Sequence, residues 1–121
     1  MVANSTRTRK TKGQEFQKEI VMALRERFKI DTDIESCFEG DIQANPMGNS
    51  GRDIKLSPLV ETIIPFDIEA KRVERLDIWK SLLQAEGNAS AGRIPLLVFR
   101  KNRSKVYACI EFETLLWITG N

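Results

Sequence analysis

The sequence predicts one small α/β domain in which a mixed central β-sheet is flanked by helices. Three observations lead to this prediction. Amphipathic helical segments alternate with short strand-like segments. The chain has 121 residues, enough for one domain with one core, and 41% of them are hydrophobic, as in a globular protein. No internal repeat and no second domain can be recognised.

The first half of the chain predicts a helix followed by loops and short strands. The helix is expected from about residue 12 to residue 29. Its apolar residues recur at steps of three and four: Phe16, Ile20, Ala23, Leu24 and Phe28. Residues 31–41 suggest a short strand or an extended loop, and residues 43–51 form a loop rich in Asn, Pro, Ser and Gly. A short strand at 53–56 follows and ends at Ser57-Pro58.

Residues 63–71 predict the strand around which the domain is organised. Apolar and polar residues alternate along it, so that one face belongs to the core. The apolar set is Ile64, Phe66, Ile68 and Ala70, and the polar set is Asp67, Glu69 and Lys71. A half-buried strand with a solvated polar face has the same pattern, so the alternation alone does not define a site.

The rest of the chain completes the sheet and its flanking helices. A helix at about 75–84 carries an apolar stripe of Leu76, Trp79, Leu82 and Leu83. The elements expected after it are a break at 87–92, a buried strand at 94–99, a hairpin turn at 101–104, a strand at 105–110 and a last helix with Phe112, Leu115, Leu116 and Trp117. Core packing or a dimer interface would account for that last helix.

Charge is concentrated at the N-terminus. Four basic residues precede the first acid, Glu15: Arg7, Arg9, Lys10 and Lys12. The net charge is +2, so the remainder of the chain carries 2 − 4 = −2. We expect residues 1–11 to be a disordered basic arm and residues 12–121 to be the folded domain. Such an arm suits a polyanion, and a solubilising tail is the alternative.

Features that are absent from the sequence limit the possible location of the protein and its possible chemistry. No apolar run approaches the roughly 18 residues of a membrane span, and no apolar segment follows the charged N-terminus. A cytoplasmic protein without a membrane partner is expected, with Cys37 and Cys109 as reduced thiols. Histidine is absent, which excludes Ser-His and Cys-His triads and histidine zinc sites. Carboxylates remain, and they suit Mg²⁺ or Mn²⁺.

Asp53, Glu69 and Lys71 are the residues that point to chemistry. Asp53 follows a glycine-rich loop, and Glu69 and Lys71 lie on the next strand. Hairpin pairing of the two strands would bring Asp53 close to Glu69, with the lysine beside them. Phosphodiester hydrolysis uses such a set, because carboxylates hold a metal that activates water. The carbonyl of Ala70 can add a ligand, and Lys71 can orient the water or stabilise phosphate charge.

Asp53 followed by Glu69-Ala70-Lys71 resembles the signature of the PD-(D/E)XK nucleases. Arg52 stands where the family name has proline. The order of helix, Gly-rich loop, Asp strand, Glu-x-Lys strand, helix and apolar strand resembles the family core over about residues 12–110. The likeness is nearest to archaeal-type Holliday junction resolvases and small phage nucleases. It implies a restriction-endonuclease-like fold, Mg²⁺ dependence and a homodimer that cuts branched DNA in recombination and repair, in the host cytoplasm if the chain is phage-encoded.

The resemblance assigns further residues to the site and to DNA. Lys12-Gly13-Gln14-Glu15 matches the start of these resolvases, so Glu15 would be the third acidic residue and a metal ligand; Glu19, one turn on, is an equal candidate. The serine and glutamine of the resolvase pattern correspond to Ser50 and Gln84. The expected DNA contacts are Arg7, Arg9, Lys10, Lys12, Ser50, Arg52, Arg72, Gln84, Lys101 and Arg103.

Each of these assignments has a structural alternative. Glu15 can be an exposed helix acid, Ser50 a turn residue and Gln84 a solvated helix residue. Arginines beside carboxylates can be simple ion pairs, and the basic turn at 101–105 can be an exposed loop. For the whole chain, the alternatives are a nuclease-like module that binds nucleic acid without cutting it, and an assembly protein in which Glu-x-Lys is incidental.

Overall fold

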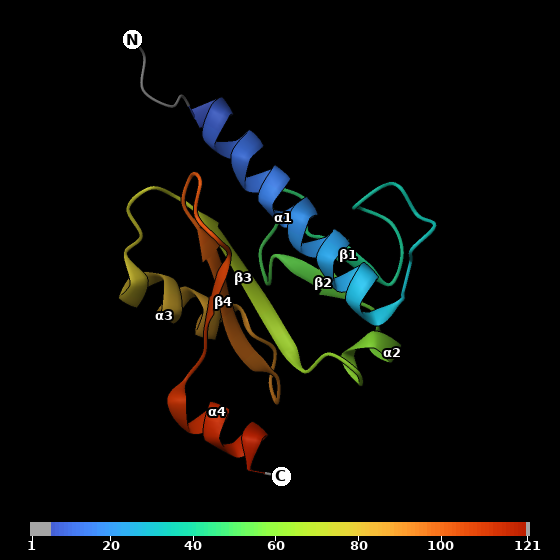
Figure 1. Cartoon of the computed structure of the whole chain (residues 1–121), viewed down its shortest axis with the longest axis vertical. Coiled ribbons are helices and arrows are strands. Elements are labelled where there is room, and N and C mark those ends of the chain that lie inside the picture. The colour runs from blue at the N-terminus through green and yellow to red at the C-terminus, as the bar shows by residue number, and fades with distance from the viewer. Residues whose placement is uncertain (1–5, 121) are drawn as a thin grey trace.

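The computed structural model describes the backbone of residues 6–120 and the side chains of residues 9–120. Its elements, in chain order, are α1 (Thr6–Phe28), β1 (Ile42–Ala44), β2 (Ile54–Leu56), α2 (Pro58–Glu61), β3 (Phe66–Arg72), α3 (Ile78–Asn88), β4 (Ile94–Arg100), β5 (Tyr107–Cys109) and α4 (Phe112–Thr119). Helices lie on both sides of the strands (Figure 1). The predicted fold class, a single α/β domain with a mixed sheet between helices, is confirmed.

The strands form two small sheets rather than one. β3 and β4 are parallel and are joined by α3, and β4 and β5 form an antiparallel hairpin, in the order β3-β4-β5. β1 and β2 form a separate antiparallel pair. The N–H of Asp53 donates to the carbonyl of Ile68 at 3.0 Å, which joins β2 to the free edge of β3.

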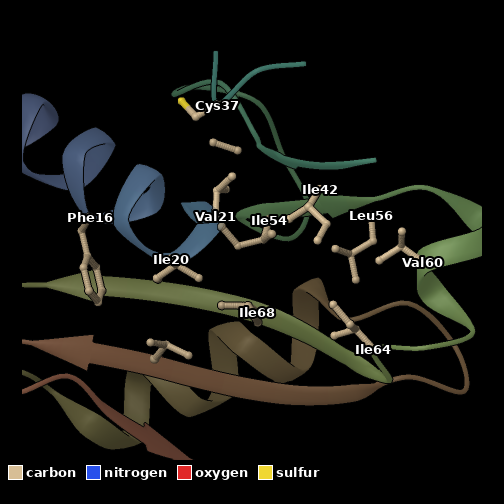
Figure 2. Close-up of a cluster of buried hydrophobic side chains, with 12 residues drawn as sticks. Phe16, Ile20, Val21, Cys37, Ile42, Ile54, Leu56, Val60, Ile64 and Ile68 are labelled. Atoms are coloured by element: carbon tan, nitrogen blue, oxygen red, sulfur yellow. The ribbon is translucent and has the colours of Figure 1, made fainter. Parts of the chain in front are cut away.

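The core lies between α1, the β1–β2 pair and one face of β3 (Figure 2). Its buried side chains are Phe16, Ile20, Val21, Cys37, Ile42, Ala44, Ile54, Leu56, Val60, Ile64, Ile68 and Val98. The predicted apolar row of the central strand is therefore correct, since Ile64 and Ile68 are 2% and 4% exposed. The helical stripe of the first helix is correct except at Ala23, which is exposed: Phe16 and Ile20 are buried in this core, and Leu24 and Phe28 pack against it.

α1 begins at Thr6 rather than near Lys12. No proline interrupts residues 6–12, and the Arg and Lys residues there have good helix propensity, so the helix extends into the basic segment. The expected disordered arm therefore differs from the structure over residues 6–11. Residues 1–5 lie outside the described part of the chain.

Residues 31–41 form a loop instead of the short strand that the alternation allowed. Arg25 of α1 explains why this loop is ordered. Its side chain is 2% exposed, and its guanidinium donates to the carbonyls of Ile34, Ser36, Glu39 and Ile42 at 2.5–3.1 Å. Backbone groups that would otherwise pair in a strand are satisfied by this one side chain.

The predicted apolar stripe of the helix after β3 is only partly correct: Leu76 and Leu82 are half-buried. The expected apolar stripe included Trp79 and Leu83, but these are 77% and 69% exposed, whereas Ser81 and Ala85 are buried. Small side chains allow α3 to lie close to β3 and β4 at the face that carries Glu69, so polar and small residues face the sheet. All side chains of α4 are at least partly exposed.

Two further expectations concern cysteine and the membrane. Cys37 is buried and Cys109 half-buried, and both are free, as predicted. None of the helices in the described residues is both long and apolar enough to cross a membrane.

Candidate active site

The polar face of β3 supplies the first part of the site. Successive strand side chains alternate, so Asp67, Glu69 and Lys71 share the face opposite the core. Glu69 is 5% exposed and Lys71 27% exposed, and Lys71 Nζ lies 3.7 Å from Glu69 Oε2. The predicted row therefore exists, but Asp67 and Glu69 are buried between β3 and α3 rather than solvated.

Asp53 reaches this face from the loop before β2. Its Oδ2 accepts a hydrogen bond from the Ala70 N–H at 2.7 Å, and its own N–H donates to Ile68 O at 3.0 Å. The predicted hairpin between residues 53–56 and 63–71 does not form, because β2 pairs with β1. The predicted proximity of Asp53 and Glu69 is nevertheless present, and it arises from these bonds at the edge of β3.

Asp53, Glu69 and Lys71 open onto one cleft of about 220 Å³ at this edge. Its remaining lining residues are Gly13, Gln17, Asn45, Pro46, Met47, Gly48, Asn49, Ala70 and Gln84. The N–H and C=O of one strand residue point to the same edge. Because the Ala70 N–H points to Asp53, the Ala70 carbonyl also faces the cleft, as a third oxygen donor would.

The two carboxyl groups interact unfavourably when both are charged. Burial, the nearby charge of Glu69 and a hydrogen bond with Glu69 raise the pKa of Asp53 to about 6, although the Ala70 N–H and Lys71 oppose the rise. A divalent cation would relieve this repulsion, and carboxylate and carbonyl oxygens are the donors that Mg²⁺ prefers. The residues at the cleft therefore fit such an ion.

Asn88, at the end of α3, holds Glu69 in place. Its Nδ2 donates to Glu69 Oε1 at 3.1 Å. Asn88 could not be recognised from the sequence, because a polar residue in a Gly- and Ser-rich segment usually marks only the end of a helix. The distance along the chain from Glu69 to Asn88 does not predict their contact, because the packing of α3 places the Asn88 amide beside Glu69.

α1 presents Gln17 to the cleft, and neither of the predicted acids lines it. Gln17 is 5% exposed and lines the cleft wall. Glu15 is 64% exposed and lies 3.9 Å from Arg72, and Glu19 pairs with Arg100 at 3.2 Å. Within residues 6–120 no three acidic or cysteine side chains gather as a metal-binding group. A residue two positions after Glu15 lies on another face of the helix, which is why Gln17 was not foreseen.

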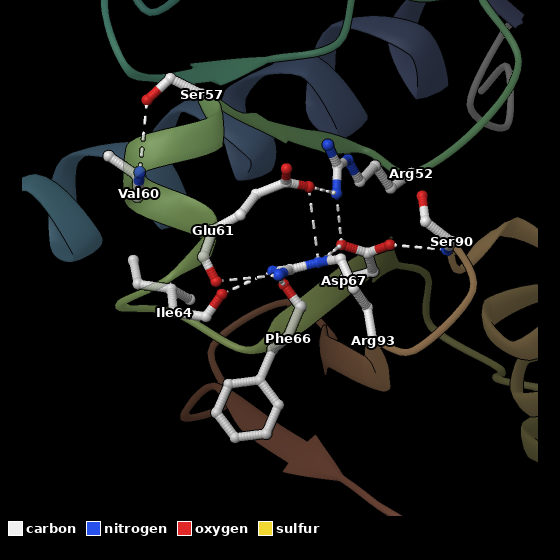
Figure 3. A network of polar contacts seen from close by, with 9 residues as sticks. All are labelled: Arg52, Ser57, Val60, Glu61, Ile64, Phe66, Asp67, Ser90 and Arg93. Atoms are coloured by element: carbon white, nitrogen blue, oxygen red, sulfur yellow. Dashed lines mark hydrogen bonds and ion pairs between the residues drawn. The ribbon is translucent and has the colours of Figure 1, made fainter.

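Arg52 belongs to a half-buried ionic network around the buried Asp67 (Figure 3). Its Nη1 lies 2.6 Å from Asp67 Oδ1 and 2.7 Å from Glu61 Oε2, and Arg93 Nε lies 2.6 Å from the same Asp67 oxygen. Burial alone would raise the pKa of Asp67, but the Ser90 N–H, Arg93 and Arg52 hold it below the ordinary value. The ion-pair alternative thus describes Arg52, which still lines a hollow of about 610 Å³ next to the cleft.

Of the two residues assigned from the resolvase pattern, Gln84 reaches the cleft and Ser50 does not. Gln84 projects from α3 into the cleft wall. Ser50 lines only the larger hollow, which shares Asn45, Gly48 and Asn49 with the cleft. Its carbonyl accepts a hydrogen bond from Asn45 Nδ2 at 3.0 Å, which stabilises this loop.

The predicted DNA-contacting basic residues are partly gathered. Arg9, Lys12 and Arg72 line a groove of about 430 Å³ at the end of β3. Lys101 and Arg103 are exposed on the turn between β4 and β5, and Lys10 is exposed on α1. The Arg7 side chain lies outside the described residues.

Comparison of the chain with models of protein families, with curated proteins and with solved structures finds no match. Function must therefore be argued from the geometry of the cleft and its surroundings.

Proposed function

We propose that this chain is a metal-dependent DNA endonuclease of the PD-(D/E)XK type that hydrolyses phosphodiester bonds. One observation carries the proposal. Asp53 and Glu69, from segments that pair with different strands, meet at a single cleft with Lys71 beside them. Burying two neighbouring carboxyl groups costs free energy and raises the pKa of Asp53, and pKa values perturbed in this way concentrate at functional sites.

Asp53, Glu69 and the Ala70 carbonyl are the groups that would hold Mg²⁺ or Mn²⁺. When bound, the ion supplies an activated water and offsets charge on the phosphate. Lys71 Nζ lies beside the Glu69 carboxylate, where it orients the attacking water or interacts with a phosphate oxygen. Asn88 fixes the Glu69 carboxylate through its amide, and Gln17 is the α1 side chain that borders the cleft.

The test is cleavage of labelled duplex, flap and four-way junction DNA with Mg²⁺, with Mn²⁺ and with a chelator. Asp53→Asn, Glu69→Gln and Lys71→Met should each lower the rate by at least about a hundredfold. Asp33→Asn, which changes an exposed acid away from the cleft, is the matched control and should keep the wild-type rate. Wild-type cleavage by Asp53→Asn or Glu69→Gln would refute the assignment.

Branched DNA and a homodimer are the proposed substrate and assembly. Supporting them, large apolar side chains are exposed on α3 and α4: Trp79, Leu83, Phe112, Leu115, Leu116 and Trp117. Exposed apolar patches of this kind mark association surfaces, and a twofold dimer would present two clefts to one branched substrate.

The alternative is a nuclease-like module that binds nucleic acid without cutting it. Two observations favour it: the described residues contain no group of three acidic ligands, and Asp53 and Glu69 already accept hydrogen bonds from Ala70 and Asn88. Metal-independent binding of DNA, with no cleavage of any substrate in either metal, would support this alternative over the endonuclease.

A further inference from the structure

A basic groove lies at the end of β3, on the side of α1. Its volume is about 430 Å³. It is lined by four cationic side chains, Arg9, Lys12, Arg72 and Arg75, and by one acid, Glu74. Arg72 Nε is buried and has no hydrogen-bond partner within the described residues, so its guanidinium keeps an unused donor. Such a groove suits an anion with several oxygens, as a phosphodiester has.

A second, more apolar hollow of about 210 Å³ adjoins the groove. The two share Val73 and Glu74 as a common wall. Phe99 and Tyr107 contribute aromatic rings to the hollow, with centroids 6.2 Å apart, and Tyr107 is 55% exposed. Exposed aromatic side chains next to cations are the usual platform on which unpaired bases stack.

Hydrogen bonds fix the wall between the two hollows. Glu74 accepts from the Asn102 N–H at 2.7 Å, and Arg72 Nη2 donates to Asn102 Oδ1 at 3.4 Å. The turn between β4 and β5 is closed by Ser104, whose Oγ accepts from the Lys101 N–H at 3.0 Å. In Figure 1 this turn lies beside α1 and the segment after β3. Both hollows are therefore held by the same turn, which pre-forms them for one ligand.

We propose that the two hollows form one subsite for an unpaired nucleotide, with its phosphate in the basic groove and its base against Tyr107 and Phe99. This inference rests on the proposed function, because it takes DNA as the partner. A paired base cannot enter a hollow of this kind without leaving its stack, so the subsite selects single-stranded or unpaired positions. Arg72 follows Lys71 on β3 but points to the opposite face of the strand. The two hollows share no lining residue with the candidate cleft, so the subsite is a separate contact for an unpaired part of the substrate.

Binding is measured with Asp53→Asn protein in chelator, so that cleavage does not interfere. Fluorescence anisotropy compares a short labelled single strand with the same strand made abasic, and an aminopurine base reports stacking by quenching. Tyr107→Ala should weaken binding of the intact strand about tenfold and abolish the quenching, since base stacking on an aromatic ring has an effect of this size. Tyr107→Phe should stay within about twofold, because the ring is kept.

Three controls keep the result interpretable. Phe38→Ala removes another exposed aromatic, in the loop after α1, and should bind like the parent. The abasic strand should bind Tyr107→Ala and the parent equally, because only phosphates are then recognised. Arg75→Gln should weaken both strands and reduce the dependence of affinity on salt.

Equal binding of the intact strand by Tyr107→Ala and the parent would overturn the subsite. So would equal losses on intact and abasic strands, which would mean that the substitution disturbs the fold or the phosphate groove only. Failure of the subsite is separate from failure of the proposed function: metal-dependent cleavage that is insensitive to Tyr107 refutes only the subsite. Base-dependent binding without cleavage refutes only the endonuclease.

Discussion

Asp53→Asn should make the protein more stable near neutral pH while it removes activity. The folded protein raises the pKa of Asp53 to about 6 from its ordinary value of 3.8, chiefly through burial and with Glu69 adding to the rise. The folded state therefore binds this proton more tightly than the unfolded chain. Stability is greatest below the unfolded pKa and falls as the pH rises toward the folded pKa.

The magnitude follows from the difference between the two pKa values. About 2 pKa units at about 1.4 kcal/mol each give about 3 kcal/mol of stability lost by the wild type above about pH 6. Asparagine removes that loss and keeps the local geometry. Its Oδ1 can still accept from the Ala70 N–H, and its Nδ2 can donate to Glu69. We expect the variant to be more stable by about 2–3 kcal/mol at about pH 8, with the advantage vanishing at about pH 4.

The assay is urea unfolding followed by far-UV circular dichroism at several pH values in chelator. A second series replaces the chelator with Mn²⁺. The ion should stabilise the wild type at about pH 8, because a ligand that binds only the folded state adds to its stability. It should have little effect on Asp53→Asn, which lacks the Asp53 carboxylate. Asp33→Asn, at an exposed acid, is the control and should follow the wild-type dependence of stability on pH. The reasoning fails if Asp53→Asn has no advantage at high pH, or if its advantage is the same at low pH.

Three other predictions concern the scaffold and the assembly. Arg25→Met should lower the free energy of unfolding by about 3–5 kcal/mol, because several buried carbonyls and Asp31 lose their partner; the exposed Arg27→Met is the control, and equal effects in urea unfolding would contradict the role given to Arg25. Asp67→Asn should lower the free energy of unfolding by about 2 kcal/mol at about pH 7. The Asp67 pKa is lowered in the folded protein, so this cost should disappear as the pH falls through that pKa, and a pH-independent cost would refute the ionic origin. Leu83→Glu with Leu116→Glu should yield a monomer in sedimentation if the exposed apolar faces of α3 and α4 associate; an unchanged oligomer with both substitutions would place the interface elsewhere.

The local sequence pattern was sufficient to predict those features that depend on a single helix, strand or turn. The alternation through Ile64 and Ile68 predicted the central strand and its core face, because side chains on a strand alternate by geometry. The apolar run at β4 predicted a buried strand, and Ser57-Pro58 predicted the break at which α2 begins with Ser57 as its N-cap. Asp53, Glu69 and Lys71 were chosen for their chemistry, and all three line the same cleft.

The sequence pattern gave wrong predictions where burial of a side chain depends on contact with a neighbouring element. Periodicity assigned the Trp79 and Leu83 side of α3 to the core, yet Ser81 and Ala85 face the sheet because small side chains allow the close approach. Glu15 was assigned to the site by the resemblance to the resolvases, but the rotation of α1 on β3 directs Gln17 to the cleft instead. The periodicity of a helix shows which residues share one of its faces. Packing against the rest of the domain determines which face is buried.

The sequence by itself determined the fold class, the core strand and the chemical character of the candidate site, because composition and local periodicity act within single segments. Only the tertiary structure decided which side chains meet: Asp53 with Ala70, Glu69 with Asn88, and Arg52 with Asp67. It also joined the basic groove to the hollow beside Tyr107. These contacts link residues from separate elements, and their positions follow from how the whole core packs, which no single segment encodes.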